Sequence, residues 1–191
     1  NTRNLIKKFF NAKKENEIIF TKNTTESINL VANSLNLKTN DVILQTDKEH
    51  NSNLIPWLNL KSKGIVRKYI QSKNNLFDLE AFKSSLTKDV KLVSMVHTSN
   101  LDGTTIPVKE IIKLAHDNGS LVLLDGAQSA PHKELDFKKL DVDFFACSGH
   151  KMLGPSGTGV LYGKYELLEK LDSYNTGGDT VESTTYDSFI L

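Results

Sequence analysis

The sequence has little of several features that would point to a function. One cysteine among 191 residues excludes an internal disulfide framework and a cysteine-rich zinc module. With 24 basic and 23 acidic side chains, the formal net charge of +1 gives no electrostatic reason to expect a nucleic-acid partner. No apolar run approaches the roughly 20 residues that cross a bilayer. We therefore expect a soluble protein with no membrane partner, located in the cytoplasm or else in an organelle.

Arginine is scarce as well. Only Arg3 and Arg67 are arginines; the other 22 basic residues are lysines, mostly interspersed with acids as on a solvated surface. The first 14 residues differ, because they carry five basic side chains and no acidic one. A targeting peptide would fit this charge, but the segment lacks a signal-type apolar core and a small-residue cleavage site. An amphipathic helix packed on the domain is the better interpretation, because the apolar residues recur at helical spacing: Leu5, Ile6, Phe9 and Phe10.

The length predicts about one domain, and short apolar runs alternate along it with segments of helical periodicity. Strands are expected over 17–20, 42–44, 65–70, 90–96, 121–124, 144–147 and 160–162. Helices are expected over 27–35, 54–60, 79–86 and 107–118. This alternation predicts an α/β fold, a three-layer α/β/α sandwich with a mostly parallel sheet. From residue 172 onward the periodicity fades, so we expect a domain over 1–171 and a linker or the start of another region over 172–191.

Polar residues gather directly after the predicted strands. In open α/β sheets, ligands bind beyond the carboxyl ends of the strands. A single polar cluster at such an end would mean little, but several together predict one site. The clusters are 24–26, 49–51, 97–100, 125–128 and 148–151.

Lys151 stands between a predicted strand and a glycine-rich loop over 154–159. A lysine in this place can bind phosphate, or form a Schiff base if burial or neighbouring cations lower its pKa. A Walker P-loop is excluded, because the lysine precedes the glycines and no Gly-Lys-Ser/Thr closes the loop. A dinucleotide fingerprint also fails, because Gly157-Thr158-Gly159 leads into a predicted strand instead of a helix.

Asp125 directly follows the uniformly apolar run Leu121–Leu124, which is typical of a strand buried on both faces. A carboxylate there needs a partner such as a cation, a metal or a protonated ring nitrogen. Capping of the next segment is the structural alternative. The 26 residues between Asp125 and Lys151 leave room for one crossover and one strand. We therefore expect both side chains at the same edge of the sheet.

Two other kinds of site fit these residues less well. A hydrolase built on Ser148, His150 and Asp125 would lack the Gly-x-Ser-x-Gly elbow. A metal site from Cys147 and His150 would have two ligands and no second pair, so we expect no metal. Cys147, which follows Phe144-Phe145-Ala146, is expected to be a core residue.

Together these clusters resemble the class V aminotransferase family, and within it the cysteine desulfurases. The SufS-type branch is the better match, because Gly149 stands between Ser148 and His150. The resemblance implies a large domain of the fold type I that depends on pyridoxal 5′-phosphate (PLP). It rests on five motifs in the family's order: Thr24-Thr25-Glu26-Ser27, Glu49-His50-Asn51, Ser99-Asn100, Asp125-Gly126-Ala127-Gln128 and Ser148-Gly149-His150-Lys151.

The resemblance also implies a role for each of eight residues. Lys151 would hold PLP as a Schiff base and move protons, and Asp125 would pair with the protonated pyridine nitrogen. His50 would stack on the ring and act as an acid or base. Gln128 would reach the phenolic oxygen of the cofactor, and Asn100 would lie near that oxygen and the substrate carboxylate.

The phosphate would be bound by three further residues of the matched motifs: Thr25, Ser148 and His150. Thr25 suits this role on physical grounds as well, because it is expected to begin a helix whose free N–H groups favour an anion.

In a cysteine desulfurase of this family, the thiolate of a mobile cysteine attacks the sulfur of the PLP-bound L-cysteine, which leaves alanine and an enzyme persulfide. An arginine binds the substrate carboxylate. Both lie in the C-terminal part of the family, and Cys147 is not the matching position. We therefore expect the large domain of a longer enzyme, inactive by itself. In full length it would be a homodimer that passes sulfur to an acceptor protein for iron–sulfur cluster assembly. A selenocysteine lyase, a β-eliminating lyase and a non-catalytic PLP-fold module are the alternatives.

Overall fold

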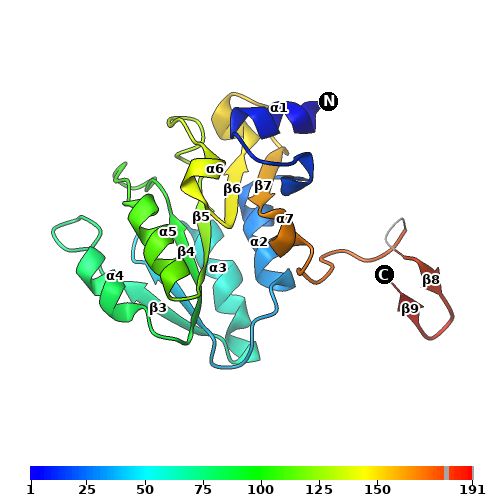
Figure 1. Ribbon diagram of the computed structural model, residues 1–191, viewed down its shortest axis with the longest axis horizontal. Coiled ribbons are helices and arrows are strands. Elements are labelled where there is room, and N and C mark those ends of the chain that lie inside the picture. Colours follow the sequence, from blue (N-terminus) through cyan, green and yellow to red (C-terminus); the bar gives the residue numbers. More distant parts are fainter. Residues whose placement is uncertain (179–180, 191) are drawn as a thin grey trace.

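The computed structural model describes residues 1–178 and 181–190 (Figure 1). In this part of the chain one sheet has seven strands in the order β1-β7-β6-β5-β4-β2-β3. The strands from β6 through β3 run parallel, whereas β7 is antiparallel to both of its neighbours, β1 and β6. The mostly parallel sheet expected from the sequence is confirmed. The strands are β1 (Ile18–Thr21), β2 (Val42–Thr46), β3 (Val66–Ile70), β4 (Val90–Val96), β5 (Leu121–Asp125), β6 (Phe144–Ser148) and β7 (Gly159–Gly163).

Helices cover both faces of this sheet, so the three-layer arrangement is confirmed too (Figure 1). One face packs against α2 (Thr24–Ser34) and α3 (Asn51–Asn59) through an apolar cluster that contains Ile28, Val31 and Trp57. The other face packs against α4 (Leu79–Ser85), α5 (Val108–Asp117) and α6 (Phe137–Leu140). Residues of β4, β5 and β6 contribute to both clusters, because strands buried on two faces point alternate side chains into each layer.

The amphipathic helix expected at the N-terminus is α1 (Thr2–Phe9). Less of its apolar face packs against the domain than the sequence predicts. Phe10, at its C-cap, is fully buried and stacks on Phe137 with ring centroids 4.8 Å apart. Leu5 and Phe9 stay 66% and 61% exposed. The chain turns away at Asn11, whose φ of 49° ends the helix.

The helix expected over 54–60, which is α3 in the structure, also differs from its expected span. It begins at Asn51 rather than Leu54, because the His50 side chain caps it by accepting a hydrogen bond from the Ser52 amide. Pro56 lies inside the helix, where it removes one intrahelical hydrogen bond without ending it. A 3₁₀ turn, η2 (Leu60–Lys63), follows and is closed by Gly64 at φ 79°.

Several short elements have no counterpart in the sequence pattern. They are α6, α7 (Tyr165–Leu168), the 3₁₀ turns η1 (Glu15–Glu17) and η3 (Gly149–Met152), and the hairpin of β8 (Ser183–Thr184) and β9 (Phe189–Ile190). The hairpin extends away from the body of the molecule, and both of its strands are exposed (Figure 1). Of the predicted second region, residues 179, 180 and 191 lie outside the described residues. None of the helices in the described part has the length and apolarity needed to cross a bilayer.

Candidate functional site

One cavity of about 280 Å³ opens at the carboxyl ends of β4, β5 and β6, beside the first turns of α2 and α3. All eight residues that the sequence singles out line it. Sequence reasoning therefore identified a set that the fold brings together, although the chain separates its members widely. The cavity is lined by Asn23, Thr24, Thr25, His50, Ser52, Val96, Thr98, Asn100, Asp125, Ala127, Gln128, Ser148, His150 and Lys151.

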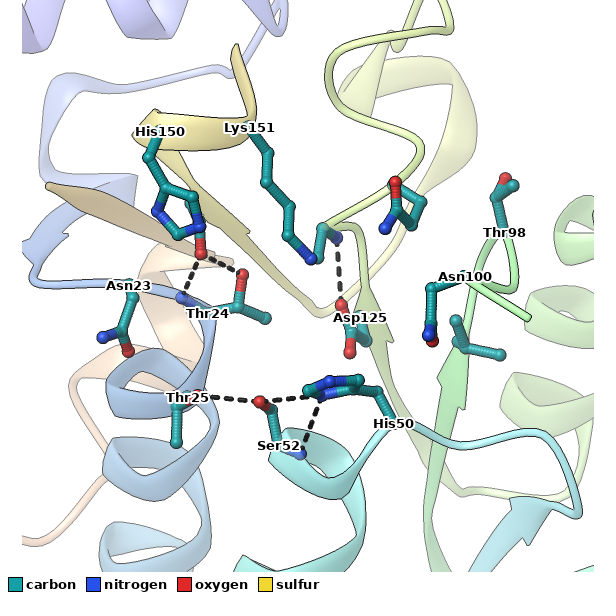
Figure 2. A pocket seen from close by; sticks show the side chains of 14 residues that line it. Asn23, Thr24, Thr25, His50, Ser52, Thr98, Asn100, Asp125, His150 and Lys151 are labelled. Atoms are coloured by element: carbon teal, nitrogen blue, oxygen red, sulfur yellow. Dashed lines mark hydrogen bonds between the residues drawn. The ribbon is translucent and has the colours of Figure 1, made fainter. Parts of the chain in front are cut away.

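The side chains enter this cavity from different elements (Figure 2). Lys151 and His150 descend from η3, directly after β6, and Asp125 lies below the lysine at the end of β5. Asn100 and His50 come from the loops after β4 and β2. Asp125 and Lys151 share one edge because β5 and β6 are neighbouring parallel strands, as the sequence predicts.

Asp125 is the buried charge of the cavity, with 2% of its surface exposed. Its Oδ1 accepts one hydrogen bond, 2.9 Å from the Ala127 amide. Burial raises the pKa of Asp125 above its ordinary value, and the Ala127 amide and the charges of Lys151 and His50 offset only part of that rise. A cation placed in the cavity would reverse the shift, because it would stabilise the ionised carboxylate. The pocket is therefore suited to bind a positively charged group next to Asp125.

The turn that carries Lys151 is fixed by close backbone packing. A Cβ on Gly149 would lie 2.2 Å from the Thr158 hydroxyl oxygen, so no other residue fits there without movement. The Gly149 amide bonds the Thr158 carbonyl, and the Gly149 carbonyl accepts from the Gly154 amide, each at 2.8 Å. This double anchor explains why a glycine precedes the His150-Lys151 pair. It holds the lysine over the cavity.

The start of α2 forms the opposite side of the cavity. The helix begins at Thr24, so the prediction that Thr25 begins it is wrong by one residue. Asn23 is the cap, and its side chain accepts from the Glu26 amide at 2.8 Å. Sequence reasoning placed Thr24 in a polar cluster but gave it no role, and both its amide and its hydroxyl bond the Ser148 hydroxyl, at 2.8 and 2.7 Å.

The first amides of α2 are therefore unequally used. Those of Thr24, Glu26 and Ser27 have partners, whereas within the described residues no acceptor bonds the Thr25 amide. An unused amide at a helix N-terminus, where the helix dipole is positive, is suited to an anion. The sequence could have revealed this start through Asn23, a favoured N-cap residue three positions before Glu26.

A relay of hydroxyl groups joins this helix start to His50. The Thr25 hydroxyl lies 2.7 Å from the Ser52 hydroxyl, which in turn lies 3.0 Å from Nδ1 of His50. Nδ1 also accepts from the Ser52 amide at 3.1 Å. Because Nδ1 accepts there, the proton of neutral His50 is on Nε2. Ser52 is a further pocket residue that the strand-end argument missed, since it lies inside a helix.

Glu49 lies behind His50 and is nearly saturated with hydrogen bonds. Oε1 accepts from the amide and hydroxyl of Thr46 at 3.1 and 2.6 Å, and Oε2 accepts from Asn53 Nδ2 at 2.7 Å. Burial nevertheless raises the pKa of Glu49 to about 7, with the charge of Asp125 adding to the shift. Sequence reasoning placed Glu49 in a polar cluster but gave it no role.

Cys147 is buried and lines a separate apolar cavity with Phe10 and Val160. Burial raises the pKa of its thiol to about 12, so it is a protonated core residue at neutral pH, as expected. The described residues include no group of three or more His, Cys, Asp or Glu side chains arranged to hold a metal ion.

The family model for class V aminotransferases matches residues 1–191. The chain belongs to this family. Among the curated class V proteins, a probable cysteine desulfurase of Synechocystis sp. is 46% identical over 192 residues, covering 98% of this chain.

Two solved structures place this class V chain beside enzymes of cysteine chemistry. The cysteine desulfurase CsdA from Escherichia coli matches with a TM-score of 0.93 and 36% identity, over 98% of this chain and 48% of its own. C-DES, a cystine C–S lyase, matches with a TM-score of 0.88 and 27% identity, over 98% of this chain and 51% of its own, in a form with glycine covalently linked to its PLP cofactor. The chain spans about half the length of the curated relatives it matches.

Proposed function

We propose that residues 1–171 are the PLP-binding domain of a cysteine desulfurase. The observation that carries this proposal is the buried Asp125 carboxylate at the base of a cavity that also receives Lys151. Burial raises the pKa of Asp125, and a protonated pyridine nitrogen beside it would stabilise the ionised carboxylate. The unused Thr25 amide at the N-terminus of α2 is suited to a phosphate. The residues present therefore fit both ends of PLP.

Each residue then has work that its position supports. When bound, PLP supplies an electron sink for a carbanion at the substrate α-carbon. Lys151 holds the cofactor covalently through its amine and carries protons to and from that carbon. Asp125 keeps the ring nitrogen protonated. His50, whose Nδ1 is fixed by Ser52, stacks on the ring and presents Nε2 as the acid or base.

The remaining residues orient the two ends of the cofactor and the substrate. Gln128 and Asn100 line the cavity and would hold the phenolic oxygen, and Asn100 would also bind the substrate carboxylate. Thr25, Ser148 and His150 bind the phosphate, and Thr24 acts with them by fixing the Ser148 hydroxyl. In this proposal L-cysteine is the substrate, the protein is a homodimer, and an acceptor protein takes the sulfur for iron–sulfur cluster assembly.

The cofactor site is tested by adding PLP to the 191-residue chain and recording its visible absorption. We expect a new visible band from the imine between PLP and a lysine amine. Borohydride should reduce this imine to a secondary amine, which removes the band and leaves PLP attached to Lys151 in a peptide map. Lys151→Ala should abolish the band. Lys113→Ala is the matched control, because Lys113 is 78% exposed on α5 and pairs only with Asp117. A band that survives in Lys151→Ala would refute the assignment.

The likeness to the lyase C-DES supports one alternative reaction, β-elimination. The two reactions differ in their products, because a desulfurase yields alanine from L-cysteine whereas β-elimination yields pyruvate and ammonia. The protein expressed at the length its gene encodes should form alanine. Pyruvate would favour the lyase, and no turnover of L-cysteine or selenocysteine would favour a non-catalytic module.

A further inference from the structure

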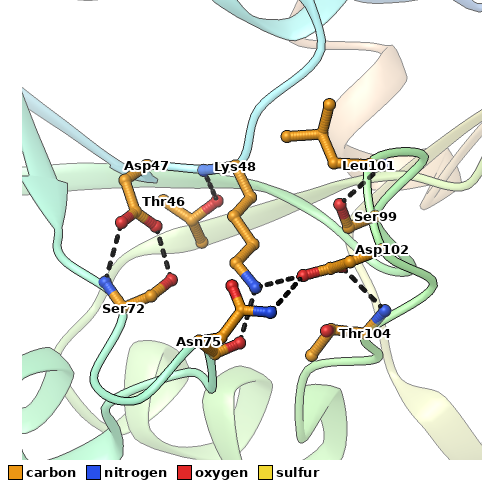
Figure 3. A network of polar contacts seen from close by, with 9 residues as sticks. All are labelled: Thr46, Asp47, Lys48, Ser72, Asn75, Ser99, Leu101, Asp102 and Thr104. Atoms are coloured by element: carbon orange, nitrogen blue, oxygen red, sulfur yellow. Dashed lines mark hydrogen bonds and ion pairs between the residues drawn. The ribbon is translucent and has the colours of Figure 1, made fainter.

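Three loops meet beside the cavity, around the side chain of Lys48 (Figure 3). The first, residues 47–50, follows β2 and ends at His50. The second, residues 71–77, follows β3. The third, residues 97–106, follows β4 and contains Asn100. Only the first and third loops line the cavity, so any bond between them sets the distance between two of its walls.

Lys48 and Asp102 make that bond. The Lys48 ammonium lies 2.6 Å from Asp102 Oδ2 and 2.6 Å from the Asn75 carbonyl oxygen. Asn75 closes the triangle by donating through Nδ2 to the same Asp102 oxygen at 3.0 Å. The side chains of Lys48 and Asp102 are 14% and 24% exposed. We refer to Lys48, Asn75 and Asp102 as the latch.

The latch, like the pairs of Asp143 with His116 and Lys164, joins segments far apart in sequence, whereas several other ion pairs lie within one helix. Lys83–Glu80 and Lys113–Asp117 connect residues of one helix, where a pair adds little to the fold. The latch connects three segments that are otherwise far apart in sequence. The charged hydrogen bond from Lys48 lowers the pKa of Asp102, with a contribution from the Thr104 amide, so the carboxylate is ionised at neutral pH.

Hydrogen bonds inside the third loop connect its residues to one another. The Ser99 amide bonds the Thr104 carbonyl at 2.9 Å, and the Gly103 amide bonds the Ser99 carbonyl at 3.0 Å. Asp102 Oδ1 accepts from the Thr104 amide at 3.0 Å. A force on Asp102 is therefore passed to Asn100, two residues earlier. Lys48 is two residues before His50, so a force on Lys48 is passed to His50 in the same way.

We propose that Asp102 is a positioning residue, whose ion pair with Lys48 holds Asn100 and His50 at a fixed separation across the mouth of the cavity. The consequence for reaction rests on the proposed function: a substrate amino acid would meet a preset wall and would not have to order the loop itself. Without the pair, part of the binding free energy would be used to order residues 99–104, which weakens binding.

The loop itself is tested first, on the cofactor-free chain. Asp102→Asn removes the charge and keeps an acceptor for Thr104, and Lys48→Met removes the cation. We expect several-fold faster hydrogen exchange of the amides of residues 99–104 in both, with shifted NMR signals of the Asn100 amide and the His50 ring. Asp141→Asn is the control. Asp141 forms a 2.8 Å ion pair with Lys164, and neither residue lines the cavity. Unchanged exchange in both latch variants would overturn the proposal.

Reversal of the charges separates positioning from general stability. Lys48→Asp combined with Asp102→Lys restores the ion pair but not the bonds to Thr104 and the Asn75 carbonyl. Exchange of residues 99–104 should therefore be slower in the double variant than in either of its single variants, and equal exchange in all three would count against the pair. In the full-length protein, the single variants should raise KM for L-cysteine several-fold more than they lower kcat. Faster loop exchange with an unchanged KM would refute the positioning role. If the wild-type protein binds no PLP, the proposed function fails, while the exchange and ring signals still decide the latch.

Discussion

Glu49 is a half-buried residue whose carboxyl group makes the charge beside the pocket depend on pH. Its oxygens accept three hydrogen bonds that favour the ionised form, yet burial outweighs them and raises its pKa to about 7. The carboxyl group therefore titrates near neutral pH, directly behind His50. Its protonation state changes the charge beside both His50 and Asp125.

This pKa predicts how stability depends on pH. The folded pKa of about 7 lies above the ordinary value of 4.5. Glu49 therefore contributes stability that is fully present below pH 4.5 and is lost as the pH rises through 7, by about 3 kcal/mol. Glu49→Gln should remove this loss, which urea unfolding at a series of pH values would show. Glu80→Gln, on an 83% exposed side chain, is the control and should keep the wild-type slope.

His97 opposes Glu49 in part of the same range. Burial lowers its pKa to about 4, with a contribution from the charge of Lys133. Because the folded pKa is below 6.5, its contribution is present above pH 6.5 and is lost as the pH falls through 4. The free energy of unfolding of Glu49→Gln should therefore rise with pH between 4 and 6.5. A falling curve in that variant would show that another group dominates.

At the scale of elements, the cavity depends on how closely α2 approaches β7. A Cβ on Gly159 would lie 2.6 Å from the backbone nitrogen and Cα of Asn23. The strand thus allows the helix start to sit where Asn23 caps it and Thr24 reaches Ser148. The glycine is needed for this contact between backbones, because a side chain would meet atoms that cannot rotate away.

Gly159→Ala tests this approach. The added methyl group should push the start of α2 away from β7, break the Thr24–Ser148 bonds and lower the free energy of unfolding by roughly 1–3 kcal/mol. Under the proposed function the affinity for PLP should fall several-fold, because the phosphate end is displaced. Gly178→Ala meets no atom within 4 Å and should leave both thermal unfolding and PLP titration unchanged. Equal PLP affinity in Gly159→Ala and wild type would contradict the argument.

The elements that sequence reasoning found are those with a strong periodic signal. The seven strands and the longer helices were predicted because apolar runs and helical spacing are local properties. The one-turn helices α6 and α7 are too short to show a period, and the true start of α3 depends on His50, a capping residue that a strand-end argument treats only as a ligand. Residue type and strand ends likewise predicted Asp125 and Lys151. The Thr24–Ser148 and Ser52–Thr25 bonds and the latch depend on which distant segments meet, and that is not a local property of the sequence.

At the scale of the whole molecule, the N-terminal segment is attached to the sheet mainly by one aromatic ring. Helix α1 has no buried residue of its own, whereas Phe10 packs against Phe137 and Phe145 with centroid distances of 4.8 and 5.8 Å. The Phe10 carbonyl also accepts from the Phe137 amide at 2.9 Å. The ring thus links the start of the chain to α6 and β6.

Phe10→Ala should therefore lower the free energy of unfolding by roughly 3–5 kcal/mol, as other buried aromatic truncations do. In a chain of this length that corresponds to a fall in Tm of about 10 °C, measurable by circular dichroism. Phe9→Ala is the matched variant, because its neighbouring ring is 61% exposed, and it should change Tm by little. Similar losses in the two variants would show that α1 is held by its exposed face instead.

The pairing of β1 with β7 has a consequence for the order in which this protein can fold. Ile18 is opposite Tyr162, and the Thr24–Ser148 bonds span 124 residues of sequence. Contacts so distant in sequence close large loops, which slows folding and raises the contact order. On the ribosome, β1 leaves the exit tunnel long before β7, its partner within the described residues, is made. The cavity is complete only after Ser148–Lys151 have been made, and a nascent chain stopped before Gly159 would keep the β1 edge open to pairing with other chains.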